Sequence, residues 1–195
     1  PSKNEIWSAK VADLVHRAAN FGLVTGPYKT NMRQVRQRKR EMVEQEVAAH
    51  VVRYETSGAE LIMGTGRFVA PKTIEVRLNA GGTRVLTGER VFLNVGTRAT
   101  MPPIPGLADS QPLSNVELLE LDRLPEHLVV LGGGYVGLEF AQAYRRFGSR
   151  VTVIADQPRL VAREDPDVAD EIRRILAADG IEFVLGADVI RVEGR

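Results

Sequence analysis

The sequence contains no cysteine, and this absence excludes several kinds of chemistry within its 195 residues. Disulfides, thiolate metal sites and a cysteine nucleophile all need a thiol group. The three histidines, His16, His50 and His127, show neither ligand spacing nor acidic partners. We therefore predict structural or surface roles for the histidines and no metal site.

Long apolar runs and an excess of charge of one sign are also missing. No run approaches the roughly 20 apolar residues that a membrane helix needs, and the N-terminal residues lack the apolar core of a signal peptide. Because the chain has 26 basic and 25 acidic residues, no overall electrostatic field favours nucleic acid or a membrane as partner. With 44% hydrophobic residues, the chain can build a packed core, and we expect a cytoplasmic protein.

Residues 33–40 form the one candidate patch for nucleic acid. No aromatic residue is interleaved for base stacking, and acidic residues follow directly. This pattern favours a solvated helix face, so we predict no nucleic-acid partner. The segment belongs to a predicted helix over residues 31–56, in which Arg40 and Glu44 lie one turn apart and are expected to pair.

The first half of the chain predicts helices followed by an antiparallel β-meander. An amphipathic helix is expected over residues 4–21, ending at Gly22. Its expected buried face comprises Trp7, Val11, Leu14, Val15 and Ala18. The period then changes to two, which predicts strands at 61–70, 73–78, 84–87 and 91–95 with a turn at 79–82. Residues 101–106, MPPIPG, predict a linker and a domain boundary.

The second half predicts alternating strands and helices. Ser114 is expected to cap a short helix over residues 115–120. Strands are expected at 128–131, 150–155 and 181–185, with one helix ending at Gly148 and another running from Asp165 and Pro166 to Gly180. The residues expected to face inward are Val136, Phe140, Ala143, Tyr144 and Phe147 in the first helix, and Val168, Ile172, Ile175 and Leu176 in the second. Short connections of this kind indicate a parallel, doubly wound sheet.

The run LVVLGGGYVGLEF, residues 128–140, carries the most informative motif. Gly132, Gly134 and Gly137 have G-x-G-x-x-G spacing at the point where the strand gives way to a helix. Glycines here permit a tight turn, approach of a phosphate to the backbone, and close packing of helix on strand. The free N–H groups and the dipole of the helix N-terminus would bind a pyrophosphate. We assign the loop, Gly133 and Val136 included, to dinucleotide binding; the alternative is an ordinary glycine-rich turn.

Asp156 follows the next strand, about 20 residues after Gly137, where a carboxylate meets the ribose hydroxyl groups of a dinucleotide. This carboxylate would repel a 2′-phosphate, whereas Arg159 could attract one. The sequence therefore favours NAD and leaves NADP open.

Taken together, the glycine loop with Tyr135 and Glu139, the meander that ends in a V-G-T turn, and the PPIPG linker resemble the pyridine nucleotide-disulfide oxidoreductases. The similarity is greatest to mercuric reductase-like and dihydrolipoamide dehydrogenase-like flavoproteins. The most specific stretch is residues 125–154, PEHLVVLGGGYVGLEFAQAYRRFGSRVTVI. The resemblance implies an α/β fold in which a partial FAD-binding domain, residues 1–105, precedes part of a Rossmann-like NAD(P)-binding domain, residues 112–195.

The resemblance also extends to the first three residues, Pro1-Ser2-Lys3. In this family a C-x-x-x-x-C redox motif, one further residue and then Pro-Ser-Lys follow one another. We therefore expect the chain to be a fragment whose cysteines lie upstream, and which lacks the FAD fingerprint, the end of the nucleotide domain and the dimerisation domain. Family members are usually homodimers, so the resemblance implies a homo-oligomer.

Roles for individual residues follow from the resemblance. Lys3 resembles the lysine near flavin N5, and Glu139 resembles the carboxylate that pairs with it beside the nicotinamide; alone, Glu139 could be a surface carboxylate. Tyr135 resembles the aromatic lid over the flavin, with ordinary packing as the alternative. These three are the expected catalytic residues.

The resemblance assigns three further glycines to FAD. Gly64 and Gly66 resemble the stretch whose backbone meets the adenine, and Gly96 matches a turn beside the cofactor. Asn94 and Val95 depart from the family's A-T-G pattern, so their side chains are not assigned contacts.

The function implied for the longer protein is hydride transfer from NAD(P)H through FAD to a redox disulfide and then to an acceptor. That acceptor is a small molecule or a thiol-linked group; mercuric ion, dihydrolipoamide and another thiol-linked acceptor stay open, although the resemblance makes a mercuric reductase-like reaction plausible. Two alternatives remain: a non-catalytic dinucleotide-binding fragment, and a nucleic-acid binder that uses residues 33–40, which would show steeply salt-dependent affinity.

Overall fold

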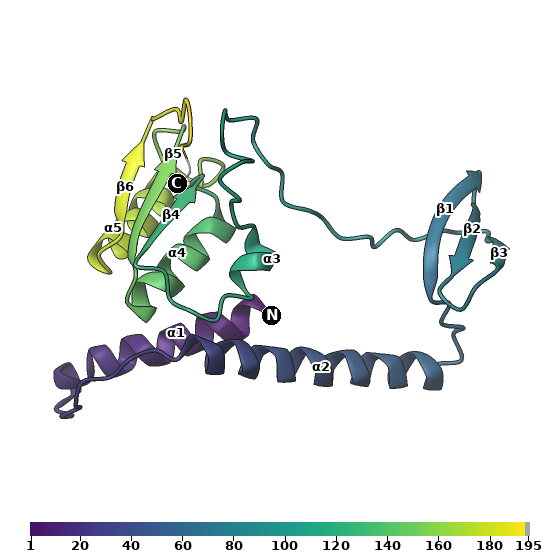
Figure 1. Cartoon of the computed structure of the whole chain (residues 1–195), viewed down its shortest axis with the longest axis horizontal. Helices are drawn as coiled ribbons and strands as arrows, with labels where there is room; N and C mark the ends of the chain where they lie inside the picture. Colours follow the sequence, from purple (N-terminus) through teal and green to yellow (C-terminus); the bar gives the residue numbers. More distant parts are fainter. Residues whose placement is uncertain (194–195) are drawn as a thin grey trace. The chain divides into compact units, whose positions relative to one another are not determined.

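The computed structural model describes residues 1–193 and divides into two compact units. One unit comprises residues 1–43 together with residues from 99 onward, and the other comprises residues 44–98. Figure 1 shows a parallel sheet with helices in the first unit and an antiparallel sheet in the second. The predicted α/β class, with both kinds of sheet, is confirmed.

The parallel sheet consists of β4 (His127–Leu131), β5 (Arg150–Ala155) and β6 (Glu182–Leu185) in the order β4-β5-β6. Helix α4 (Tyr135–Phe147) connects β4 to β5, and α5 (Pro166–Ala178) connects β5 to β6. Each element agrees with the sequence prediction to within a residue or two at its ends. This consecutive order, with parallel pairing throughout, agrees with the predicted β-α-β connections.

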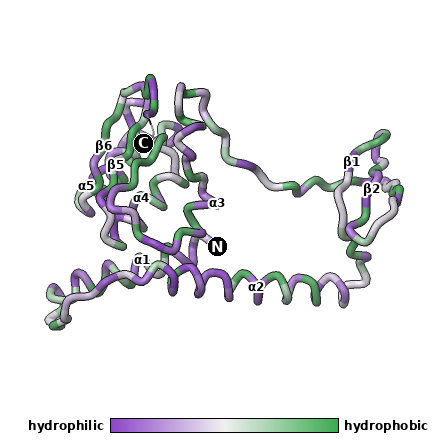
Figure 2. Tube along the Cα trace, in the orientation of Figure 1, coloured by the Kyte–Doolittle hydropathy of each residue, from purple (hydrophilic) through white to green (hydrophobic). Residues whose placement is uncertain are grey.

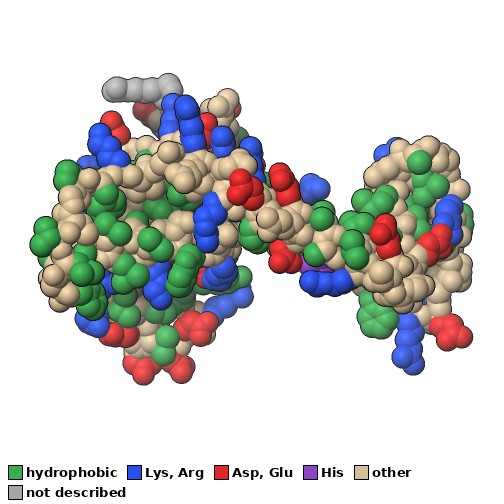
Figure 3. Space-filling view, turned by 90° about the horizontal axis from the view of Figure 1, so that it is seen from below, with side chains coloured by type: hydrophobic (Ala, Val, Ile, Leu, Met, Phe, Trp, Pro, Cys, Tyr) green, Lys and Arg blue, Asp and Glu red, His purple; other side chains and the backbone are tan. Residues whose placement is uncertain are grey.

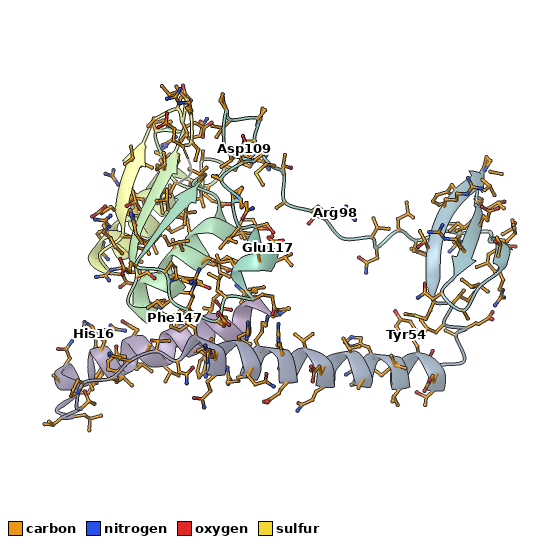
Figure 4. The ribbon with its side chains drawn as sticks, viewed as in Figure 1. His16, Tyr54, Arg98, Asp109, Glu117 and Phe147 are labelled. Atoms are coloured by element: carbon orange, nitrogen blue, oxygen red, sulfur yellow. The ribbon has the colours of Figure 1, made fainter. Side chains whose placement is uncertain are left out.

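The core of this unit lies between the sheet and α4. Val151, Val153 and Tyr144 are fully buried, and Phe147 packs edge-on against Tyr144 with ring centroids 5.9 Å apart. Figure 4 labels Phe147 near the end of α4, which Gly148 terminates in the left-handed conformation. Figure 2 colours much of β4 and β5 as hydrophobic, as expected for strands of a parallel sheet.

Three residues expected to face inward are exposed instead. Val136 is 41% exposed, Val168 45% and Ile175 43%. Val136 lies in the first turn of α4, above the end of the sheet. On α5 the buried stripe is centred on Ala169 and Leu176, which leaves Val168 and Ile175 at its edge.

The first helix is shorter than predicted, and its buried face is a different one. Helix α1 spans Ser2–His16, and a 3₁₀ turn, η1 (Ala18–Phe21), completes the segment before Gly22 takes the left-handed conformation. The buried residues of α1 are Glu5, Ala9 and Asp13. The predicted apolar face is largely exposed, with Trp7 at 54%, Val11 at 45% and Leu14 at 44%. The reason is that α1 packs on α4 through its small and polar side.

Helix α2 (Met32–Thr56) is confirmed, but the predicted pair of Arg40 and Glu44 is replaced by another contact. Arg40 Nε donates to Glu120 at 2.9 Å, because the segment after α3 brings that carboxylate beside α2. Helix α3 spans Asn115–Leu118 and has the predicted cap: Ser114 Oγ accepts from Val116 N, and Glu117, labelled in Figure 4, accepts from Ser114 N.

The second unit contains a three-stranded antiparallel sheet of β1 (Gly64–Ala70), β2 (Thr73–Leu78) and β3 (Thr83–Thr87). Three of the four predicted strands are thus confirmed. The fourth, residues 91–95, is wrong: this segment has no regular secondary structure and no strand pairing. Its alternation alone cannot make a strand, since a strand needs a hydrogen-bonded neighbour, and β3 pairs only with β2 in the described part of the chain.

Candidate functional site

The glycine loop follows β4 directly and has the backbone geometry of an anion site. Gly132 has a φ of +104°, and its N–H donates to Ile154 O at 2.7 Å, which holds the turn against β5. Gly134 is the N-cap of α4 and has extended backbone. The first N–H groups of α4, which lack helical partners, therefore open where the loop ends.

The four glycines of the loop serve different needs. A Cβ on Gly137 would lie 3.0 Å from Val130 Cγ1, and one on Gly133 would lie 3.2 Å from Leu160 Cδ2. Both positions are therefore closed by packing. At Gly132 and Gly134 a Cβ would meet nothing within 4 Å, so the backbone there is open to a ligand. This combination of tight packing and open backbone fits a dinucleotide pyrophosphate.

A cleft of ≈ 500 Å³ lies beside the loop, which is within the usual range for small-molecule sites. Gly133, Gly134 and Tyr135 line one part of it, and Asp156, Arg159 and Arg163 line another. The structure thus brings the predicted ribose carboxylate and the predicted phosphate loop into one cleft. Tyr135 is 72% exposed at its rim. Val136, also assigned to the cofactor, lines a neighbouring apolar cleft instead.

The segment that closes this cleft was missed by the sequence prediction. Val161 N donates to Gly133 O at 2.9 Å, and Leu160 is 1% exposed beneath the loop. Val161 has a φ of +39°, which is unusual for a β-branched residue. The backbone therefore folds sharply back onto the glycine loop and carries Arg159 and Arg163 with it. No local pattern in residues 157–164 signals this fold-back.

Lys3 and Glu139 form an ion pair between α1 and α4. The Lys3 side chain is 76% exposed and that of Glu139 is 34% exposed, so the pair lies at the surface of the unit. Glu139 stands one turn after Tyr135 on α4, next to the glycine loop. The structure therefore brings together all three residues predicted to be catalytic with the predicted dinucleotide loop.

The remaining predicted cofactor residues, Gly64, Gly66 and Gly96, belong to the other unit. A Cβ on Gly64 would lie 2.3 Å from Arg77 O, so strand pairing alone requires glycine there. A Cβ on Gly66 would lie 3.2 Å from Ile74 Cγ2. Gly96 has a φ of +71° with open space around it. A tight turn and close backbone approach are features that fit a cofactor cradle, and the assignment to FAD stays a prediction.

Among residues 1–193, neither a cluster of metal-binding side chains nor a patch of one charge indicates a second site. No three His, Asp or Glu side chains there converge as metal ligands do, and no helix there is both long enough and apolar enough to cross a membrane. Several basic side chains of residues 33–40 have internal partners: Arg36 and Arg40 bond Glu120, and Arg38 bonds Asn4. On the face seen in Figure 3, both signs of charge are interspersed with hydrophobic side chains.

The fold and the site together have the features of a dinucleotide-binding α/β protein, with a lysine-carboxylate pair beside the glycine loop. Comparison with known proteins specifies the family. The model of the family described as pyridine nucleotide-disulphide oxidoreductase matches residues 8–195. The chain therefore belongs to the pyridine nucleotide-disulphide oxidoreductases, a family of flavoprotein enzymes.

Relatives of established name agree with this assignment. A mercuric reductase of Bacillus cereus is 33% identical over 99% of this chain, and a dihydrolipoyl dehydrogenase of Bacillus subtilis is 32% identical over 97%. The solved structure of the HOCl-induced flavoprotein disulfide reductase RclA from Escherichia coli superposes with a TM-score of 0.80 at 30% identity over 98% of this chain. The chain spans 30%, 42% and 40% of the lengths of these three proteins.

Proposed function

We propose that the chain contributes the nicotinamide-binding loop and the flavin-facing ion pair of an FAD-dependent oxidoreductase. The proposed reaction passes hydride from NAD(P)H through FAD to a redox disulfide and then to an acceptor, in the manner of a mercuric reductase-like enzyme. The observation that carries the proposal is the pairing of Lys3 with Glu139 beside the glycine loop. The 195 residues contain no cysteine, so they do not supply the disulfide themselves.

The residues of this chain would bind and orient the dinucleotide. The open backbone at Gly132 and Gly134 and the N-terminus of α4 would bind the pyrophosphate, and Asp156 would accept from the ribose hydroxyl groups. Asp156 carries a negative charge where a 2′-phosphate would lie, which favours NAD. Arg159 and Arg163 line the same cleft, and their positive charges would favour NADP if they outweigh the charge of Asp156.

The ion pair would act by electrostatics and orientation. Bound FAD would supply the redox chemistry, accepting hydride and passing electrons onward. The Lys3 ammonium would stabilise negative charge on the cofactor, and Glu139 would hold that ammonium in place and orient the carboxamide. Tyr135, exposed at the rim of the cleft, would shield the cofactor face.

A second candidate is a non-catalytic dinucleotide-binding fragment. It is favoured by the division of the predicted cofactor residues between two compact units, each of which contains only some of them. Under this alternative the cleft beside the glycine loop binds NAD(H) and no flavin is retained.

One experiment separates the candidates. The purified chain is incubated with FAD, the excess is removed, and the visible absorbance spectrum is recorded. A retained flavin band that NADH bleaches supports the oxidoreductase, whereas NADH binding without retained flavin supports the fragment.

Variants then test the ion pair. Glu139→Gln should slow bleaching by at least tenfold without loss of flavin. The matched control is Glu171→Gln, which breaks an exposed ion pair with Arg174 on α5. Equal rates for the two variants would remove Glu139 from the proposal.

A further inference from the structure

A carboxyl group is buried between α1 and α4 without a charged partner of its own. Glu5 is 2% exposed, and its Oε1 has no hydrogen-bond partner within residues 1–193. A charged carboxylate in such a position loses its hydration without replacement. Glu5 lies on the same helix as Lys3, at the interface through which α1 contacts α4.

The side chains around Glu5 donate to other acceptors. Tyr144, from α4, donates its hydroxyl proton to Leu118 O at 2.8 Å. Lys39, from α2, is 3% exposed and donates to Leu119 O at 2.8 Å and to Glu120. Glu120, from the segment after α3, accepts from both Lys39 and Arg40. These side chains are the titratable and charged groups that face Glu5 from the neighbouring elements.

The neighbouring tyrosine does not replace this lost hydration at Glu5 Oε1. The Tyr144 hydroxyl lies near Glu5 but donates to Leu118 O, and Glu5 Oε1 accepts no hydrogen bond within residues 1–193. A carboxylate with an unpaired, dehydrated oxygen costs more free energy than an uncharged carboxyl group in the same place. The burial and the unpaired oxygen of Glu5 therefore favour its neutral form.

We propose that Glu5 is a positioning residue that carries a proton and, in this neutral form, seats α1 on α4 so that Lys3 stays against Glu139. The importance of that pair rests on the proposed function, but the seating of the helix does not. Ionisation of Glu5 loosens the interface and separates the pair.

The pKa of Glu5 is shifted in the direction that favours this neutral form. Burial raises the pKa of Glu5 from 4.5 to about 7; the charge of Lys39 and the nearby Tyr144 hydroxyl oppose this rise, and the charge of Glu120 adds to it. Since the folded chain then binds more protons than the unfolded chain between pH 4.5 and about 7, the stabilisation is complete below this window and is lost as the pH rises through it.

The first test needs no cofactor. The Glu5 carboxyl carbon is followed by ¹³C NMR in the whole chain, with assignment from Glu5→Gln. A midpoint near 7 is expected, and an ordinary midpoint near 4.5 would overturn the proposal. Because this measurement uses the unmodified chain, it holds even if a variant fails to fold.

The second test reads the position of α1. Trp7 is the single tryptophan and lies two residues after Glu5, so its fluorescence emission and anisotropy report the seating of the helix. Between pH 5.5 and 8.5, roughly one pH unit or more either side of the midpoint, we expect a shift in the unmodified chain and none in Glu5→Gln, which is neutral throughout. Glu41→Gln, an exposed carboxylate on α2, is the control and should behave like the unmodified chain.

A pH-dependent signal that persists in Glu5→Gln would refute the positioning role. In protein that retains FAD, the rate of bleaching by NADH should fall over the same pH window and become pH-independent in Glu5→Gln. Absence of retained flavin would count against the proposed function alone, since the NMR and fluorescence results stand without it.

Discussion

Gly134 and Gly137 belong to one glycine motif, yet the lack of a side chain has a different role at each position. Gly137 has no room for a Cβ beside Val130, whereas a Cβ on Gly134 would point into open space. For Gly137→Ala, overpacking costs about 1–3 kcal/mol, and the better helix propensity of alanine offsets about 1 kcal/mol. We expect a net loss of unfolding free energy of up to ~2 kcal/mol, measured by urea denaturation.

Gly134→Ala should do the opposite. Its φ of −80° suits alanine, so stability should change by less than about 1 kcal/mol. The added methyl group would meet the approaching pyrophosphate, so NADH should bind at least tenfold more weakly by fluorescence titration. Equal effects of both substitutions on stability would show that the loop is only a packed turn.

Asp156 and Arg159 make opposing contributions to the choice of nicotinamide cofactor in the same cleft. Asp156→Asn removes the charge that would repel a 2′-phosphate, so the ratio of NADPH to NADH affinity should rise about tenfold, or about 1.4 kcal/mol. Arg159→Ala should lower the same ratio. Calorimetric titration of both dinucleotides measures it, and an unchanged ratio in both variants would place the ribose outside this cleft.

At the scale of elements, α2 is anchored by one buried lysine. The Lys39 ammonium bonds Leu119 O and Glu120, and the hydrogen bond from Lys39 is the main reason why the pKa of Glu120 lies below its ordinary value. Lys39→Ala would leave the Leu119 carbonyl without its partner and open a gap, so we expect a loss of about 2–3 kcal/mol. Arg33→Ala, an exposed position on the same helix, should stay within about 0.5 kcal/mol. Thermal and urea unfolding compare the two.

The elements differ in how far their sequences could predict them. Strands β4 and β5 and helix α4 were predictable because their own residues carry the period, the glycine stops and the buried face. Helix α1 was predictable as a helix, but its buried side was not. Ala9 lets α4 approach closely, and Asp13 pairs with Arg17 one turn further along the chain. The neighbours of Glu5, namely Lys39, Glu120 and Tyr144, are remote in sequence, so its burial could not be predicted.

In the candidate site, too, the features set by local sequence could be predicted and those set by long-range contacts could not. Spacing alone predicted the glycine loop and the place of Asp156, because both depend on local geometry. The fold-back of Val161 onto Gly133 depends on a long-range hydrogen bond and a rare φ, so no residue pattern announced it. The prediction of a strand at residues 91–95 was wrong for a related reason, since a strand exists only where another strand pairs with it.

At the scale of the whole molecule, β4 is an edge strand. Among the described residues only β5 pairs with it, and its outward residues Val129 and Leu131 are 47% and 39% exposed. An unpaired, apolar edge is a template for pairing with another strand. We therefore expect concentration-dependent association of the chain, measured by size-exclusion chromatography with light scattering.

A charge placed on this edge should oppose the association. Val129→Lys puts an ammonium group on the pairing edge and should shift the chain towards monomer at a given concentration. Val168→Lys, at a similarly exposed valine on α5, leaves the edge unchanged and should associate as the unmodified chain does. If both variants associate equally, the contact is made by another surface, and the exposed apolar side of α1, with Trp7 and Val11, becomes the next to test.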